Sequence, residues 1–412
     1  MTRGVRLGLI WIGLSALAGA AEAEGLSLRT AFTQSNAHAI ASSLDTFLGF
    51  QNRVGETANA RLMWDKNLGD FKLEIQSDLS FVGGDNIAYA AALAPYVPAA
   101  PPATYFNLTQ TWQSSTASTI TNRIERLNVT YSAPSFVLRA GRQAITWGNG
   151  MVFHPADIVA PFAPNAVDTA YKPGADMVYG QYLFDNGADI QAIAVPRANV
   201  AQGPIRFDAS TYAIRAHVQL GSLETSLMFA RDRGDSVASL GFSGALGGAS
   251  WNAEYVNWTL NGGAVQPSWV VNISNFSSLF GRNIAYFGEF YHNGFGVDAP
   301  APLSALPASL TKRISTGQVF VAGRNFLALG AQVQVTPDLT ISPNAIISFN
   351  DHSALAGFSA NYTLSDNTNM VLSYTQPIGT VGTEFGGRET ATSSGIYVAP
   401  TRSLSLQLVR FF

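Results

Sequence analysis

The 412-residue chain contains no cysteine, and only 12% of its residues are charged. The missing cysteines exclude a disulfide framework and thiolate metal sites, and they suit export through an oxidising periplasm. The charged fraction is about half of what soluble domains carry, which indicates that much of the surface does not face water. The net charge is −3 and no basic run occurs, so the sequence predicts no nucleic-acid partner.

Long apolar runs are also missing beyond the N-terminus. After residue 23 no apolar stretch is long enough for the usual transmembrane helix. Residues 1–23 differ, because Arg3 and Arg6 precede an apolar run at 7–17 and small residues at 18–23. This is the form of a cleaved secretory signal peptide, and we expect cleavage after Ala23.

What the sequence does contain is a period of two. Residues 404–408 read LSLQL, and similar alternation covers 211–220 and 327–335. Such alternation places apolar side chains on one face of a strand and polar side chains on the other. The runs are about ten to twelve residues long, which matches a tilted membrane-spanning strand.

Turn signals divide the chain into eighteen expected strands, or sixteen if the two weakest, 43–51 and 235–245, fail. The expected ranges are 43–51, 57–65, 70–82, 122–132, 135–147, 174–184, 188–196, 209–220, 222–232, 235–245, 249–259, 267–276, 284–292, 324–335, 338–349, 353–364, 368–376 and 402–412. Most connections alternate between short turns and long loops, which is typical of bacterial outer-membrane barrels.

The pattern therefore predicts an all-β protein, a transmembrane antiparallel β-barrel spanning residues 43–412, with short periplasmic turns and long extracellular loops. Residues 24–42 are expected to be a periplasmic N-terminal segment, an extra strand or an insert in the pore. An eighteen-stranded barrel is too wide for its own side chains to fill. Loop 148–173 is stiffened by Pro155, Pro161 and Pro164, and we expect it to fold inward and narrow the lumen; loops 83–121 and 293–323 are the alternatives.

A specific motif precedes this loop. Residues 141–148 read GRQAITWG, and Pro155 and Asp157 follow. This block resembles the Gly-Arg-Gln-x-x-x-Trp-Gly block of Gram-negative outer-membrane barrel families, such as alginate-export-like proteins and substrate-selective porins. The resemblance implies a transport role in the outer membrane, in contact with its lipid, but no particular solute.

The C-terminal strand also carries a signal. It ends in Phe412 after the alternating LSLQLVRF, and it resembles the terminal strand of bacterial outer-membrane proteins. That resemblance implies recognition by the barrel-assembly machinery.

Two arginines are the main candidates for pore selectivity. Arg142 and Arg126 lie on adjacent expected strands, and a charge on such a strand should face the lumen because facing lipid is costly. Arg139 has the opposite parity to Arg142, and Gly141 between them suits a β-bulge that re-aims the second arginine.

Loop acids complete this hypothesis. Asp157 and Asp168 could face the arginines, and the resulting transverse field would select small charged solutes. The alternative is that the arginines only hold the loop through salt bridges. Further lumen candidates are Gln143, Arg215, Glu224, Glu289, Arg324 and Gln332.

The sequence thus predicts an outer-membrane porin for passive, partly selective passage of small polar or anionic solutes. One alternative is a channel for fatty acids or aromatic compounds, since loops 88–106 and 295–310 are rich in Ala, Pro and Phe. A barrel hydrolase is disfavoured because no nucleophile motif or metal-spaced histidine pair occurs. Another alternative is a barrel that encloses a cytochrome, but the chain itself contains no haem-binding motif. Neither an enzyme nor a cofactor is therefore predicted, and the solute, direction of flow and oligomeric state stay open.

Overall fold

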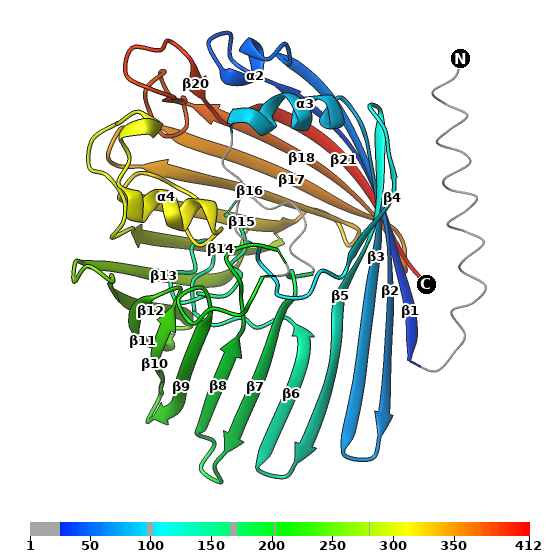
Figure 1. Ribbon diagram of the computed structural model, residues 1–412, viewed down its shortest axis with the longest axis vertical. Coiled ribbons are helices and arrows are strands. Elements are labelled where there is room, and N and C mark those ends of the chain that lie inside the picture. Colours follow the sequence, from blue (N-terminus) through cyan, green and yellow to red (C-terminus); the bar gives the residue numbers. More distant parts are fainter. Residues whose placement is uncertain (1–24, 97–101, 165–170, 202, 280) are drawn as a thin grey trace.

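The computed structural model describes residues 25–96, 102–164, 171–201, 203–279 and 281–412. Eighteen strands form a closed antiparallel barrel (Figure 1). The barrel strands are β1 (Leu26–His38), β2 (Asn52–Leu68), β3 (Phe71–Gly84), β5 (Ser118–Ala133), β6 (Phe136–Gln143), β7 (Ala175–Leu183), β8 (Asp189–Val195), β9 (Thr211–Leu220), β10 (Leu223–Asp232), β11 (Asp235–Leu246), β12 (Ala249–Thr259), β13 (Val265–Leu279), β14 (Arg282–His292), β15 (Asn325–Gln334), β16 (Leu339–Ser348), β17 (Ala354–Ser365), β18 (Thr368–Ile378) and β21 (Arg402–Phe411).

Short elements occupy the connections. The helices are α2 (Leu44–Phe47), α3 (Asp85–Leu93), η2 (Ala94–Tyr96), η3 (Leu303–Ala305) and α4 (Ala308–Ser315). β4 (Thr109–Ser114) pairs with β5, and β19 (Arg388–Glu389) with β20 (Tyr397–Val398). No helix among the described residues is long and apolar enough to cross a membrane.

The barrel closes through its first strand, which the sequence pattern did not predict. β1 pairs with β2 along its whole length and with β21 over Arg29–His38. Residues 25–42 are therefore mainly barrel wall, which is the extra-strand alternative and not the periplasmic segment or pore insert. The strand was overlooked because Thr, Gln and Asn on both faces weaken its alternation.

The expected first strand, 43–51, is also wrong. Ser43 caps α2, and its hydroxyl accepts a hydrogen bond from the Thr46 amide. Asp45 in the first helical turn adds a favourable charge at the positive end of the helix dipole. The other weak strand is confirmed as β11.

At one end of the barrel, which also holds the start of β1 and the end of β21, the connections are all short, and we call this the short-turn end (Figure 1). Gly247 and Gly248 make one such turn with φ values of 56° and 87°, which L-residues rarely adopt and which two-residue hairpins need. The longer connections gather at the opposite, long-loop end.

Alternation along the strands separates two faces of the wall. On β13, Val271 and Ile273 are 46% and 49% exposed, while Asn272 between them is 1% exposed. Strand pairing carries the same inward parity around the ring, for example from Glu254 through Val270 to Tyr291. Apolar residues thus face outward, as the hydrocarbon region of a membrane requires.

Two sectors of the inner face differ in chemistry. In the packed sector, the long-loop half of β7–β12, inward side chains are apolar and buried against loops; they include Met177, Ile193, Val195, Met228, Val256 and Trp258. At the long-loop end of β15–β17, the inward residues Phe326, Ala328, Ile346 and Leu355 form a second apolar cluster with the loop residues Phe153 and Phe385. In the open sector, which is the remaining inner face of β15–β18 and β21, most inward residues are small or polar and uncharged; they include Gly330, Gln332, Ser342, Asn344, Ser359, Ser373 and Ser405.

Candidate pore and constriction

The connection between β6 and β7, residues 144–174, crosses the interior of the barrel, and we call it the crossing loop. It begins earlier than expected, because β6 ends at Gln143 and does not extend to Trp147. Its described residues contact β12 and β14, six and eight strands further round the eighteen-stranded ring. Loop segments accordingly lie inside the ring of strands in Figure 1.

Two buried carboxylates on the far wall hold this loop by its backbone. Glu289 on β14 accepts hydrogen bonds from the amides of Met151, Val152 and Phe153, the last two at 3.0 and 2.7 Å. The Asn272 side-chain amide donates to the same carboxylate at 3.1 Å. Hydrogen bonds to an ionised acceptor are about twice as strong as neutral ones, so Glu289 fixes the turn at 151–153.

Glu254 on β12 makes a second clamp. Its carboxylate accepts from the Asn149 amide at 3.0 Å and from the Ala156 amide at 2.9 Å. Gly148 lies against this carboxylate with a φ of 101°, a conformation that favours glycine. The predicted lumen residue Glu289 is thus an anchor, and Glu254 is an anchor that the sequence reasoning missed.

An ion pair joins the two limbs of the crossing loop near the wall. The Lys172 ammonium contacts the Asp157 carboxylate and also donates to the Ile145 carbonyl. Burial raises the pKa of Asp157 and lowers the pKa of Lys172, and each partner's charge opposes the shift of the other. Asp157 is 3% exposed, so it closes the loop and presents no charge to the lumen.

Tyr171 connects the crossing loop to the first strands. The Arg61 guanidinium lies 4.5 Å and the Arg29 guanidinium 5.4 Å from the centre of its ring. Arg61 also forms a 2.6 Å ion pair with Asp78 on β3. Pairing of β1, β2 and β3 places these three charged residues on one inward row.

The prediction that Arg142 faces the lumen was wrong. It has the parity of Phe136 and Leu138, which are exposed on the outer face, and the β5–β6 register is continuous at Gly141, without a bulge. The shift in register lies instead on β5, between the partners of Gln76 and Ser77.

The Arg142 side chain fills the wall where β6 stops pairing with β5. Its guanidinium binds Asp176 on β7 through two hydrogen bonds, at 2.8 and 3.0 Å. It also donates to the carbonyls of Ile124 and Phe106. The side chain is 1% exposed, so the geometry favours the anchoring alternative for this residue.

Arg126 faces inward but its guanidinium is occupied. It donates to the carbonyls of Lys172 and Glu125 at 2.6 and 2.7 Å. Arg126 therefore supports the return limb of the crossing loop. Arg324 lies at the long-loop end, where it pairs with Asp298 at 2.7 Å. Asp168 lies outside the described residues.

Arg139 and Arg215 do face open space. Both line a cavity of about 750 Å³ on the inner wall, together with a third cation, Lys72, and two carboxylates, Asp70 and Glu74. Arg139 donates to the Thr130 hydroxyl at 2.9 Å, and Arg215 has no hydrogen-bonding partner among the described residues. Neither guanidinium is in an ion pair with a carboxylate of the described part of the chain. We call this space the basic cavity.

A second cavity of about 520 Å³ lies along β13–β18 against the crossing loop. Its lining includes Met151 and Val152 of the loop, Phe287 of β14, and Gln332 of β15. No charged residue lines it within the described chain. We call it the neutral cavity.

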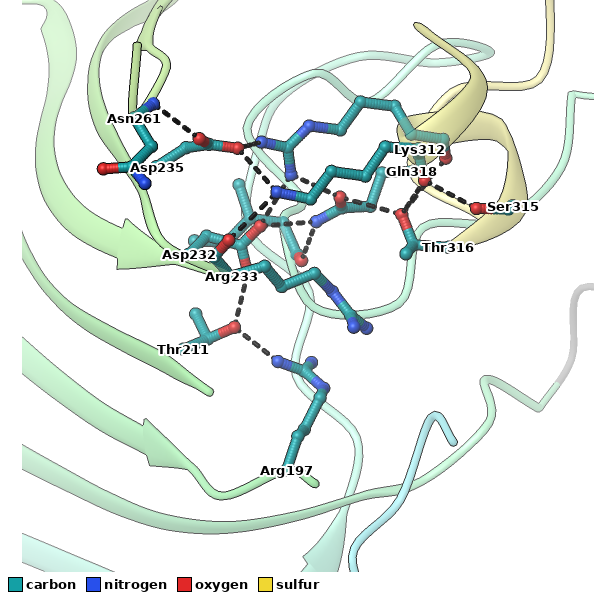
Figure 2. A network of polar contacts seen from close by, with 12 residues as sticks. Arg197, Thr211, Asp232, Arg233, Asp235, Asn261, Lys312, Ser315, Thr316 and Gln318 are labelled. Atoms are coloured by element: carbon teal, nitrogen blue, oxygen red, sulfur yellow. Dashed lines mark hydrogen bonds and ion pairs between the residues drawn. The ribbon is translucent and has the colours of Figure 1, made fainter. Parts of the chain in front are cut away.

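A polar network at the long-loop end fixes α4 above the packed sector. Arg313 on α4 pairs with Asp232 at 2.9 Å and with Asp235, and its guanidinium lies 3.9 Å from the centre of the Trp258 ring. Figure 2 shows Lys312 reaching the same Asp235, and Gln318 bonded to Asp232. The Gln318 amide also donates to the Ile158 carbonyl at 2.8 Å, so α4 and the crossing loop form one unit.

These features define a wide closed antiparallel barrel whose lumen is partly filled by its own loops. This is the architecture of Gram-negative outer-membrane barrels, and solved structures share it. OccK5 (OpdH) of Pseudomonas aeruginosa is similar over 94% of this chain and 97% of its own, with 10% identity and a TM-score of 0.58. OccAB1 of Acinetobacter baumannii covers 95% and 98%, with 10% identity and a TM-score of 0.53.

Wzi is also similar; it is described as an outer-membrane protein involved in group 1 capsule assembly in Escherichia coli and as a carbohydrate-binding β-barrel. It covers 97% of this chain and 87% of its own, with 9% identity and a TM-score of 0.52. At these identities the likeness shows the fold. No protein-family model and no curated protein sequence matches the chain.

Proposed function

We propose that this protein is an outer-membrane channel for passive passage of small polar solutes, with a preference for anions. The observation that carries the proposal is the basic cavity, where Arg139 and Arg215 project toward open space without a carboxylate partner among the described residues. Lys72 adds a third cation to the same lining, so three cations face two carboxylates there, Asp70 and Glu74; Lys72 also pairs with Asp65 at 3.2 Å.

The crossing loop narrows the lumen, so that the charges of the basic cavity can act on passing solutes. Solvent screens a charge over about 8–10 Å at physiological salt, so a cation in a wide lumen would act only on nearby solutes. Glu254 and Glu289 hold the loop across the barrel, which confines the remaining aqueous path. Charges in a narrow space with low-dielectric walls have a focused field, and the basic cavity would therefore attract anions.

The test is ion preference in planar bilayers. Arg215→Gln should shift the reversal potential toward cations, and Arg139→Gln should add to that shift, most strongly at low ionic strength. Arg206→Gln is the matched control, because Arg206 is an exposed loop residue paired with Asp208. An unchanged reversal potential in the double variant would reject the anion preference.

The neutral cavity supports a second candidate, passage of apolar solutes such as fatty acids or aromatic compounds. Met151, Val152 and Phe287 give part of its lining an apolar character. Uptake by liposomes containing the protein separates the two candidates. A labelled aromatic compound entering faster than a small carboxylate would favour the second.

The cellular context is part of the same proposal. Residues 1–23 would direct export and be removed, and the strand ending at Phe412 would be recognised by the barrel-assembly machinery. Phe412 hydrogen-bonds to Leu28 on β1 at 2.9 Å, so it also joins the closing pair of strands. Phe412→Asp should reduce the folded protein in the outer membrane, measured by its heat-shifted mobility on gels.

A further inference from the structure

The polar network around α4 contains more positive than negative charge. Its cations are Arg197, Arg233, Lys312 and Arg313, and its carboxylates are Asp232 and Asp235. Arg313 and Lys312 pair directly with these two carboxylates. Two guanidinium groups, those of Arg197 and Arg233, therefore remain without an acidic partner among the described residues.

Arg197 is the more enclosed of the two. It follows β8, and its side chain is 1% exposed. One terminal nitrogen donates to the Thr211 hydroxyl, which in turn donates to Asp232. Its Nε–H has no partner in the described structure. A buried donor left unsatisfied is destabilising, and more so when the group is charged, so this arrangement calls for an additional acceptor.

Arg233 lies close to Arg197 and is similarly unsatisfied. Burial, together with the positive charge of Arg233, lowers the pKa of Arg197 to about 10. The Arg233 Nε–H has no partner within the described residues, and its side chain is partly exposed. Figure 2 shows both side chains beside Asp232 and Thr211, away from the contact between Lys312 and Asp235.

We propose that Arg197 and Arg233 form a binding site for a small oxyanion of the sulfate or phosphate type, reached from the Arg233 side. Planar guanidinium groups match such oxygens with two parallel hydrogen bonds. A dianion would also balance the two surplus positive charges. This site lies at the long-loop end, and its occupation does not depend on transport or on the basic cavity.

The backbone conformation at Arg233 allows a substitution that removes the side chain without disturbing the turn. Arg233 has a φ of 47° and precedes Gly234 at 87° in a two-residue turn. Asparagine adopts this left-handed conformation more readily than most residues. Arg233→Asn should therefore remove the guanidinium while keeping the turn, whereas Arg197→Gln removes a deeply buried group and is the less conservative change.

The experiment is calorimetric titration of the purified full-length protein in detergent with sodium phosphate, then sodium sulfate, at millimolar concentrations and constant ionic strength. We expect saturable binding to the wild type and to Arg282→Gln, a variant of an exposed arginine at the short-turn end of β14, at the opposite end of the barrel. Binding by Arg233→Asn should be roughly ten- to hundredfold weaker, the effect expected for one charged hydrogen-bonding partner.

Methyl phosphate distinguishes the source of the anion. Equal binding of methyl phosphate and inorganic phosphate supports recognition of the dianionic group alone. Tighter binding of the ester supports a phosphorylated solute held by the same two arginines. No saturable binding of any probe to the wild type, or wild-type affinity in Arg233→Asn, would overturn the proposal.

Discussion

The packed and open sectors are built from strands with the same alternation, yet loops fill the lumen against the packed sector and leave it open against the other. In the packed sector the inward residues of β7–β12 are apolar and join Ile158 of the crossing loop and Leu310 of α4 in one hydrophobic cluster. In the open sector the inward Ser, Asn, Gln and Gly residues of β15–β18 and β21 belong to neither of the two hydrophobic clusters. The alternation of residues along a strand therefore determines whether a side chain faces inward or outward. Whether a loop packs on the inner face depends on whether the inward side chains are apolar or polar.

The two sectors also differ in how charge is used. Within the packed sector and its borders, carboxylates act as internal fasteners: Glu254 and Glu289 hold backbone amides, and Asp232 and Asp235 hold α4. The described inward residues of the open sector carry no charge. The free cations of the basic cavity lie on the short-turn side of the packed sector, on β6 and β9.

The largest expected effect comes from unfastening α4. Arg313→Met leaves two buried carboxylates with fewer partners, and removing one partner of a buried ion pair costs about 3–5 kcal/mol. We expect faster hydrogen exchange and proteolysis in residues 303–319, with the barrel strands still protected. Lys312→Met is the matched control: Lys312 reaches the same Asp235 from a side chain 42% exposed, and such pairs contribute about 0–1 kcal/mol. Equal protection in the two variants would contradict the role of Arg313.

Next in size is the removal of packing inside the cluster. Ile158 is 1% exposed and contacts α4 through the same core. Truncation of a buried isoleucine to alanine costs about 2–5 kcal/mol. Ile158→Ala should therefore loosen the crossing loop and raise open-channel noise in single-channel recordings. Recordings indistinguishable from wild type would mean that the loop is held by its polar clamps alone.

The clamp itself gives the third prediction. Glu289→Gln replaces a carboxylate by an amide whose NH₂ group cannot accept from the amides of residues 151–153. Each buried donor left unpaired costs about 1–3 kcal/mol, so the loop should leave its place in part of the population. Conductance should then show additional, larger levels. Glu224→Gln is the control, because Glu224 is an inward carboxylate that, among the described residues, hydrogen-bonds only to the Ser243 hydroxyl.

A feature of the fold or site could be predicted from the sequence when it depends on residues that are close together along the chain. Strand pattern and turn chemistry are local, so the eighteen-stranded barrel and most boundaries could be predicted. The polar strand β1 could not, since its partners β2 and β21 supply what its own pattern lacks. Arg142 was misplaced because pore-facing and wall-filling arginines look alike in sequence; the difference lies in Asp176 on the neighbouring strand.

The missed anchors show the same limit. Glu254 lies 105 residues from Asn149 and 98 from Ala156, and nothing near Glu254 in the sequence points to the crossing loop. One signal was available: Val256 and Trp258 continue the inward parity of Glu254 with apolar residues. A strand that is apolar on both faces is typical of burial on both sides, and here it marks where a loop covers the inner wall.

The smallest expected effect tests the open sector. Ser359 on β17 faces inward, is partly exposed and lines the neutral cavity. Ser359→Ala should change the free energy of unfolding by no more than about 0.5 kcal/mol, as for substitutions away from packed or networked sites. Ser359→Arg should also fold, because water in the lumen can solvate the new charge, and it should move the reversal potential further toward anions. Heat-shifted mobility on gels and bilayer recordings on the same two variants check both statements. If Ser359→Ala destabilises the barrel as much as Ile158→Ala does, the neutral wall is packed against something, and the distinction between the two sectors fails.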